Sequence, residues 1–259
     1  MNFMLKHTFA VILLFCALMV HAQEDISFSA DRPGNSTGVD IMPQWKIQWE
    51  TGVAYEWAER GNEQGITLNN SLFRLGLTNN CELRFQIDNA LAHTAGGDWN
   101  YGVANVALGT KVKLFDGWKG VPKVSLMGNI LIPGGKKHSF LPQHAGGQLH
   151  LLFQNDVCSW FNVGYDIGGD WNGDKANPDC FLAACFNFQP ADKLSCFFES
   201  YNYFSSDKQW YDKKFLCATE IGAAYMVAPR VQIDLAADMH FNQPRNYFSV
   251  AFGVAWQIN

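Results

Sequence analysis

SLFRLGLTNNCELRFQIDN, residues 71–89, has the pattern of two strands joined by a tight turn. Apolar and polar side chains alternate strictly in its second half, with Cys81, Leu83, Phe85 and Ile87 against Glu82, Arg84, Gln86 and Asp88. Successive side chains of a strand point to opposite faces, so the stretch predicts a sheet with one apolar and one charged face. Asn79 and Asn80 tolerate the positive φ that a hairpin turn requires.

Two environments suit such a hairpin. In a water-soluble sheet the apolar face packs on a core and the charged face meets solvent. In a membrane barrel the apolar face meets lipid and the charged face lines a lumen. One hairpin leaves both readings open, and the rest of the chain separates them.

The first 22 residues have the features of a secretory signal. Lys6 and His7 precede an apolar run over residues 9–20, and Val20-His21-Ala22 resembles a cleavage site. Residues 23–43 are polar, and we expect an irregular segment there, either periplasmic or inserted in a lumen. The predicted organisation is therefore a signal peptide at 1–22, this segment at 23–43 and a barrel at 44–259.

The composition favours the membrane reading. Charged residues make up 17% of the chain and aromatic residues 14%, whereas soluble domains carry about 25% charged residues. A lipid-facing surface between two aromatic girdles would have this composition. The net charge of −5 offers no basic patch, so we expect no nucleic-acid partner.

Alternating stretches recur along the chain, from residues 46–57 to the last at 247–258. Tight turns follow every second stretch, for example at Asn155-Asp156, and longer polar loops follow the others. Short turns on one side, long loops on the other and an even strand number are typical of outer-membrane barrels. We predict an all-β fold, a single antiparallel up-and-down transmembrane β-barrel of about 12 strands, in the outer membrane of a diderm bacterium after a cleaved signal peptide.

The chain also resembles a family of outer-membrane barrels named for the meta-cleavage pathway of phenol degradation. The resemblance rests on ordered short motifs: Asp31-Arg32-Pro33, Arg74-x-Gly76-Leu77-Thr78, Glu82-Leu83-Arg84, Gly109-x-Lys111, Pro122, Ile132-Pro133-x-Gly135, Phe198-Glu199, Gly222-x-x-Tyr225, Gln232-x-Asp234 and Gly253-Val254-x-Trp256. The Ile258-Asn259 ending departs from the aromatic terminal residue that is usual in such barrels. The resemblance implies a barrel and the transport of small solutes, apolar or aromatic compounds included, and it supplies no catalytic residues.

Polar side chains on the charged faces are predicted to line the lumen: Glu50, Arg74, Glu82, Arg84, Gln86, Asp88, Lys111, Lys113, Asp166 and Asp234. Lumen residues tune the selectivity of a pore. Alternatively they form a salt-bridged filling that closes it, because about 12 strands lie between barrels that side chains fill and barrels that leave a channel. Folding of the Asp31-Arg32-Pro33 segment into the lumen as a plug is a further hypothesis.

Other constellations are weaker. Cys185 and Cys196 could form a disulfide across a turn, although we expect the cysteines to be free. Neither His138, His144 and His150 nor Asp170-x-Asn172-x-Asp174 matches a known metal site, and we predict no metal, no cofactor and no catalytic residue.

We therefore predict a channel or transporter for small solutes. The alternatives are a non-conducting structural or adhesive barrel, a lipid-modifying enzyme using His150, and a lipocalin-like binder. The expected partners are outer-membrane lipid and lipopolysaccharide, a small-molecule solute and the barrel-insertion machinery. The sequence leaves the substrate and the oligomeric state open.

Overall fold

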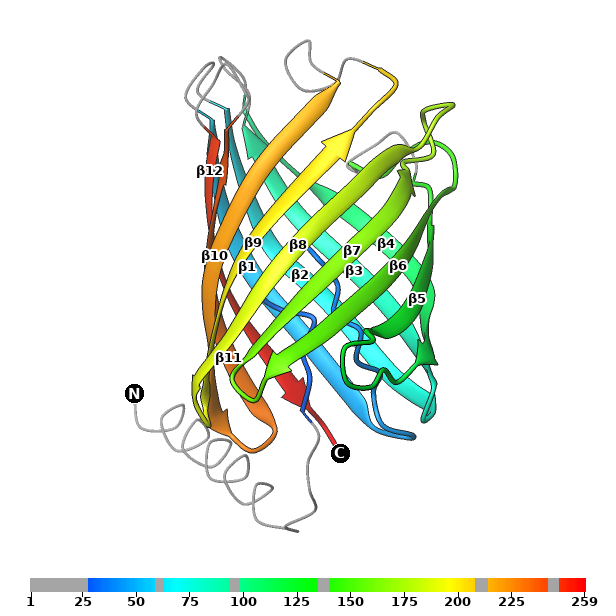
Figure 1. Cartoon of the computed structure of the whole chain (residues 1–259). Coiled ribbons are helices and arrows are strands. Elements are labelled where there is room, and N and C mark those ends of the chain that lie inside the picture. Colours follow the sequence, from blue (N-terminus) through cyan, green and yellow to red (C-terminus); the bar gives the residue numbers. More distant parts are fainter. Residues whose placement is uncertain (1–27, 59–62, 94–97, 135–139, 208–213, 242–246) are drawn as a thin grey trace, which may run out of the picture.

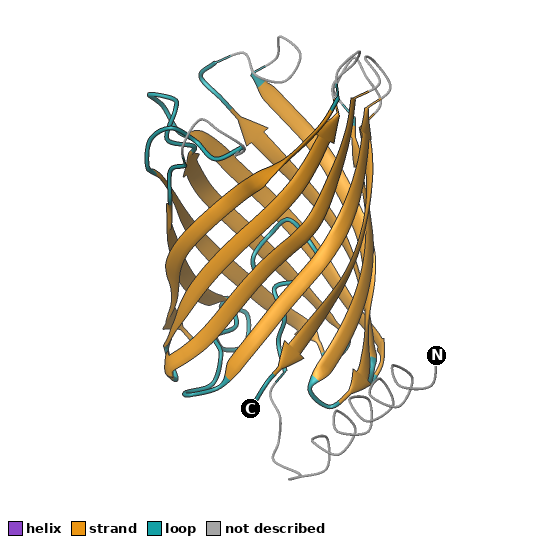
Figure 2. Cartoon of the chain, turned by 180° about the vertical axis from the view of Figure 1, so that it is seen from behind, coloured by secondary structure: helices purple, strands orange, loops and turns teal. Residues whose placement is uncertain are grey.

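The computed structural model describes residues 28–58, 63–93, 98–134, 140–207, 214–241 and 247–259. These residues form a closed barrel in which each strand pairs antiparallel with the next, and β12 pairs with β1 (Figures 1 and 2). The strands are β1 (Ile47–Ala58), β2 (Glu63–Thr78), β3 (Cys81–His93), β4 (Trp99–Phe115), β5 (Lys123–Leu131), β6 (Gly146–Cys158), β7 (Phe161–Trp171), β8 (Asp179–Ala191), β9 (Leu194–Phe204), β10 (Phe215–Ala228), β11 (Val231–His240) and β12 (Tyr247–Gln257). The predicted fold class and strand number are confirmed. A helix that could span a membrane is absent from the described ranges.

The connections alternate in length as predicted, except that the one after β4 spans seven residues, 116–122. Four of the short turns, at 79–80, 159–160, 192–193 and 229–230, span two residues each, and they lie at the end of the barrel that holds the C-terminus (Figure 1). The turn predicted at Asn155-Asp156 is wrong, because these residues continue β6 and pair with Val163 and Asn162 of β7. Asn155 follows Leu151 and Phe153 on the outward face, so a polar side chain ends the outward apolar series without ending the strand. Asp156 has the parity of the inward His150 and contacts Lys123.

The two faces of the wall are inverted relative to a soluble sheet. Outward side chains such as Phe85 and Leu108 are 40% and 53% exposed, whereas Arg74 and Lys111 on the inner face are 0% exposed. A soluble domain would bury the apolar set and expose the charges. The inner face is therefore the lumen, and the outer face has the apolar character that a lipid bilayer requires.

The described residues that precede β1 begin at residue 28, and they lie inside this wall (Figures 1 and 2). The described part of the predicted N-terminal segment, residues 28–43, contacts lumen side chains of strands all around the barrel. We refer to residues 29–43 as the inserted segment. Trp45 and Lys46 then hydrogen-bond the backbone of Gly76 and Pro43, and they lead the chain into β1. The predicted signal peptide at 1–22 lies outside the described residues.

The disulfide considered between Cys185 and Cys196 is excluded by the register of β8 and β9. Cys185 pairs with Glu199, and both face the lumen. Cys196 is three residues from Glu199 on β9, so its side chain points to the outer face. The two thiols thus lie on opposite faces of the wall. None of the described cysteines forms a disulfide.

Candidate functional site

The inserted segment begins at a buried ionic cluster. The Asp31 carboxylate lies 2.5 Å from Arg84 Nη1, 3.0 Å from Lys111 Nζ and 3.6 Å from Arg74 Nη1. Arg74 in turn contacts Glu50 at 3.1 Å and Glu82 at 2.9 Å. The cluster therefore holds three carboxylates and three cations, and removal of any one of them would leave a buried charge uncompensated.

The electrostatics of Asp31 follow from these contacts. Burial raises the pKa of its carboxyl, but the charges of Arg74, Lys111 and Arg84 outweigh burial and hold this pKa well below its usual range. Asp31 is thus an anion at any pH at which the barrel functions, and it fastens the segment to β2, β3 and β4.

Arg32 fastens the segment on the other side of β1. Its guanidinium contacts Asp234 of β11 at 3.2 Å and Asn70 of β2 at 3.3 Å. It lies against Gly52 of β1 and Gly253 of β12, where an added Cβ would come within 2.4 and 2.3 Å of guanidinium atoms. The two glycines are Cα partners, so the missing side chains create the space that the arginine occupies.

Further barrel side chains satisfy the backbone of the inserted segment. Backbone N–H groups of the segment donate hydrogen bonds to carboxylates of the wall: those of residues 35 and 36 to Glu199, that of residue 37 to Asp166 and that of residue 42 to Glu82. Carbonyl groups accept from side chains, that of residue 38 from Lys111, that of 39 from Ser125 and that of 40 from Arg74. Irregular backbone in a membrane protein is tolerated where such partners exist, so the lumen is built to hold this segment.

Apolar packing adds to these bonds. Val39 of the segment is buried against Met127 of β5 and Leu152 of β6. Met42 is 1% exposed, and its neighbour Pro43 approaches Gly76 so closely that an added Cβ would lie 2.0 Å from the Pro43 carbonyl oxygen. The inserted segment is therefore a packed part of the barrel interior.

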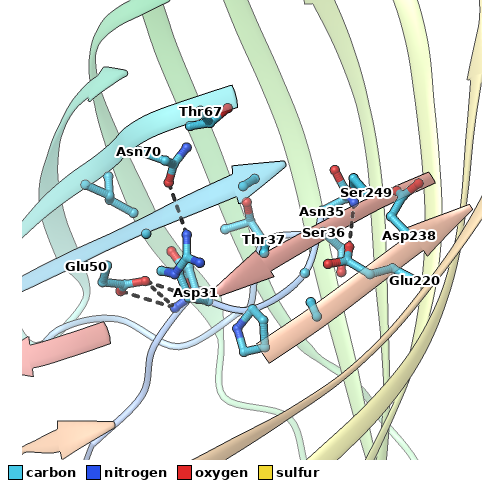
Figure 3. Close-up of a pocket in the computed structure, with 18 of the residues that line it drawn as sticks. Asp31, Asn35, Ser36, Thr37, Glu50, Thr67, Asn70, Glu220, Asp238 and Ser249 are labelled. Carbon is cyan, nitrogen blue, oxygen red and sulfur yellow. Dashed lines mark hydrogen bonds between the residues drawn. The ribbon is translucent and has the colours of Figure 1, made fainter. Parts of the chain in front are cut away.

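Above the segment, on the long-loop side, the lumen widens into a cavity of about 420 Å³. Residues 31–37 form its floor, and Asp31, Asn35 and Thr37 of this stretch are labelled in Figure 3. The wall of the cavity reaches Glu56 and Tyr247, near the strand ends at the long loops. Beside it lies a second cavity of about 150 Å³, lined in part by His150, Asp166 and Phe181. The lumen is thus hollow above the inserted segment and filled at its level.

The predicted lumen residues fall into separate groups. Five of them, Glu50, Arg74, Glu82, Arg84 and Lys111, meet in the cluster around Asp31. Asp234 contacts Arg32, Asp166 contacts the segment at residue 37, and Gln86 donates to Asp88. Lys113 lies apart from them, at the short-turn end, where it contacts Asp116 at 2.6 Å.

The predicted lumen set leaves out three carboxylates, Glu199, Glu220 and Asp238, which are buried on the lumen face of β9, β10 and β11. Alternation places Asp238 on the polar face of its strand with Asp234, whereas Glu199 and Glu220 were not found. In β9 the lumen face also carries Phe197 and Tyr201, so aromatic side chains occur on both faces and hide the alternation. The register with β10, where Glu199 pairs with Glu220, reveals the pattern.

The histidines do not assemble a metal site in the described part of the chain, where no three His, Cys, Asp or Glu side chains could share an ion. His150 lies 2.6 Å from Asp166 and 3.1 Å from Asp170, one contact for each ring nitrogen. Both nitrogens are therefore engaged, and neither is positioned to activate a hydroxyl nucleophile. His144 contacts Asp174 at 3.3 Å, and His138 lies outside the described residues.

Solved structures with the same fold are outer-membrane barrels. An outer membrane channel from Pseudomonas putida F1 is 10% identical, with a TM-score of 0.68 over 87% of this chain and 99% of that one. The NanC porin is 12% identical, with a TM-score of 0.56 over 80% of this chain and 100% of that one. No curated protein matches the chain. The model of the family described as "Putative MetA-pathway of phenol degradation" matches residues 30–258. The chain therefore belongs to this family.

Proposed function

We propose that the barrel is an outer-membrane channel for small solutes, whose passage is closed by the inserted segment. The observation that carries the proposal is the change in filling along the lumen. A cavity of about 420 Å³ lies on the long-loop side, and its floor is formed by residues 31–37. A solute can enter from the long-loop side and reach the segment, and passage requires the segment to shift.

The contacts of the segment support a movable barrier. Polar and charged side chains make most of its contacts, with apolar packing limited to Val39 and Met42. The backbone of the chain joins the ladder of the wall from Trp45 onward. Displacement breaks hydrogen bonds that water can replace, since the cavity beside the segment is polar. The wall itself keeps its closed ladder and is not disturbed by this movement.

Aromatic compounds are the solutes that the family description suggests, because it refers to phenol degradation. Tyr201 and Tyr247 line the cavity and offer aromatic faces to such a ring, while Ser249 and Asn70 offer hydrogen bonds to a hydroxyl group (Figure 3). We therefore propose small aromatic compounds that carry a polar group as the solute class.

Uptake into proteoliposomes tests the channel. We expect swelling in arabinose, a small polar solute, and in phenyl glucoside, an uncharged aromatic that crosses lipid slowly. Arg32→Gln removes the contact with Asp234 and is expected to accelerate uptake, whereas Arg230→Gln in the β10–β11 turn serves as the matched control. No uptake by either the wild type or Arg32→Gln would contradict the channel.

A non-conducting structural or adhesive barrel is the second candidate. It is favoured by the balanced, fully buried cluster around Asp31, which is the salt-bridged filling expected of a closed barrel. Planar-bilayer recordings separate the two, because this candidate requires zero conductance for the wild type and for variants that release the segment.

The remaining parts of the proposal concern cellular context. We propose that residues 1–22 are removed on export. Residues 23–43 then comprise the inserted segment and the few residues that lead into it, and residues 44–259 form the barrel. Lipid and lipopolysaccharide would meet the outward apolar side chains, and insertion machinery would assemble the barrel. Mass spectrometry of the protein purified from outer membranes would show whether the mature chain begins at Gln23.

A further inference from the structure

Three carboxylates form a row across adjacent strands of the lumen wall. Glu220 of β10 is the Cα partner of Glu199 of β9 on one side and of Asp238 of β11 on the other. All three are buried on the inner face, at 0%, 6% and 6% exposure for Glu199, Glu220 and Asp238. Like charges directly opposite each other across strands repel, so the row needs compensation.

Neutral hydrogen-bond donors compensate part of the repulsion between these carboxylates. Ser36 donates to Glu199 through its backbone N–H at 3.1 Å, Asn35 Nδ2 donates to Glu220 at 2.5 Å, and the Tyr201 hydroxyl donates to Asp238. Among the residues that the structure describes, no lysine or arginine lies within ion-pair distance of the row. The nearest cation of the segment, Arg32, is engaged by Asp234.

One oxygen of the row is left without a donor. Asp238 Oδ1 is buried and has no hydrogen-bond partner, although the Asp238 side chain lines the cavity. His240 Nε2 is 3.5 Å from it, too far for a good hydrogen bond. Buried carboxylate oxygens are almost always satisfied, so the orphan oxygen points to a donor that enters the cavity.

The cavity has the size and lining for a small ligand around this oxygen. Its volume of about 420 Å³ is within the range of small-molecule sites, about 300–1,000 Å³. Glu220 and Asp238 lie together on one wall (Figure 3), and Tyr201 and Tyr247 are beside them. Tyr247 is stacked on His240 at a ring separation of 3.8 Å, which holds its ring in place.

We propose that this cavity binds a small organic cation, a protonated amine attached to an aromatic ring. The ammonium lies between Glu220 and Asp238 and donates an N–H to Asp238 Oδ1, and the tyrosine rings contact the ring and the charge. The inference rests on the proposed channel function for its biological meaning, but binding is measured without transport, so the two can fail separately.

Calorimetry on the full-length barrel in detergent tests the site, with benzylamine as the probe at pH 7. Benzyl alcohol and benzoate are the neutral and anionic probes of similar shape. We expect benzylamine to bind and the other two to bind at least about tenfold more weakly, since a charge-assisted hydrogen bond is lost. Equal binding of benzylamine and benzyl alcohol would overturn the proposal.

Variants locate the site. Glu220→Gln and Asp238→Asn should each weaken benzylamine binding about tenfold, because each removes one charge from the ammonium site. Ala251→Phe fills the cavity and leaves the carboxylates in place, so it should abolish binding. Asp156→Asn, which removes a carboxylate outside the lumen cavity, is the matched control and should bind as the wild type does. Heat-modifiable gel migration verifies that each variant is folded, and unchanged binding in all three cavity variants would place benzylamine elsewhere and refute the site.

Discussion

Asp31→Asn should release the inserted segment. The substitution keeps the shape of the side chain but removes the anion that Arg74, Arg84 and Lys111 share. The cluster then contains these three cations against two carboxylates, Glu50 and Glu82, and one buried positive charge has no partner. The segment can relieve it only by leaving the site, which admits water to the cations.

The magnitude follows from the burial of the cluster. Breaking a buried ion pair by removing one partner costs about 3–5 kcal/mol, and the amide retains part of the hydrogen bonding, so we take about 3 kcal/mol. At about 1.4 kcal/mol for each tenfold change, the ratio of conducting to closed time should rise about a hundredfold. Asp116→Asn, which removes an exposed partner of Lys113, should change it less than about fivefold.

Single-channel recording in planar bilayers measures this ratio directly. Heat-modifiable migration of the same samples shows that the barrel is intact. An Asp31→Asn barrel that is folded and has wild-type open time would refute the argument, because a buried cation cannot then be what the segment neutralises.

Three further predictions follow from the same geometry. The pKa of Asp31 lies below its usual value of 3.8, so the stability that its ionised carboxylate contributes is complete above that value and is lost only as the pH falls through the lower, folded-state pKa. The difference in open time between wild type and Asp31→Asn should therefore be constant from about pH 8 to about pH 5. A difference that changes near pH 6 would contradict this prediction. Gly253→Ala should push Arg32 off the wall and raise the conductance, whereas Gly164→Ala, whose new Cβ meets nothing nearer than 3.8 Å, should not, and equal traces would show that the contact is unimportant. Leu108→Arg on the lipid face should cost about 2–4 kcal/mol of unfolding free energy, against about 0–1 for Val157→Arg near the short turns; urea titration in lipid vesicles measures both, and equal losses would place Leu108 away from hydrocarbon.

Much of the fold is predictable from the sequence because lipid leaves few options. Strict alternation in 81–88 gives the two faces, and the alternating loop lengths give the up-and-down order. The turn at Asn155-Asp156 was misplaced since strands extend beyond the apolar band, where polar outward residues such as Asn155 are tolerated. The alternation of apolar and polar residues indicates which part of a strand faces lipid, but it does not indicate where the hydrogen-bonded strand ends.

The site was less predictable. Inward charges on β2, β3 and β4 follow from alternation, but their partner Asp31 lies in an aperiodic segment whose contacts depend on the closed barrel. The row at Glu199 was hidden because Phe197 and Tyr201 put aromatic rings in the lumen. Which inward residues meet is set by strand register, and register is fixed by pairing between distant parts of the chain.

The position of Arg32 has a consequence for how the cylinder stays shut. The first and last strands, β1 and β12, meet at a seam that joins the two ends of the barrel sequence, and Gly52 and Gly253 face each other across it. Arg32 lies over that junction, with Asn70 on one flank and Asp234 on the other, so it ties β2 to β11 across the two strands between them. Residues that precede the barrel thus stabilise the closure of the barrel. A chain that lacks Arg32 should close the β1–β12 pairing more slowly during folding, and its unfolding should begin at that pairing.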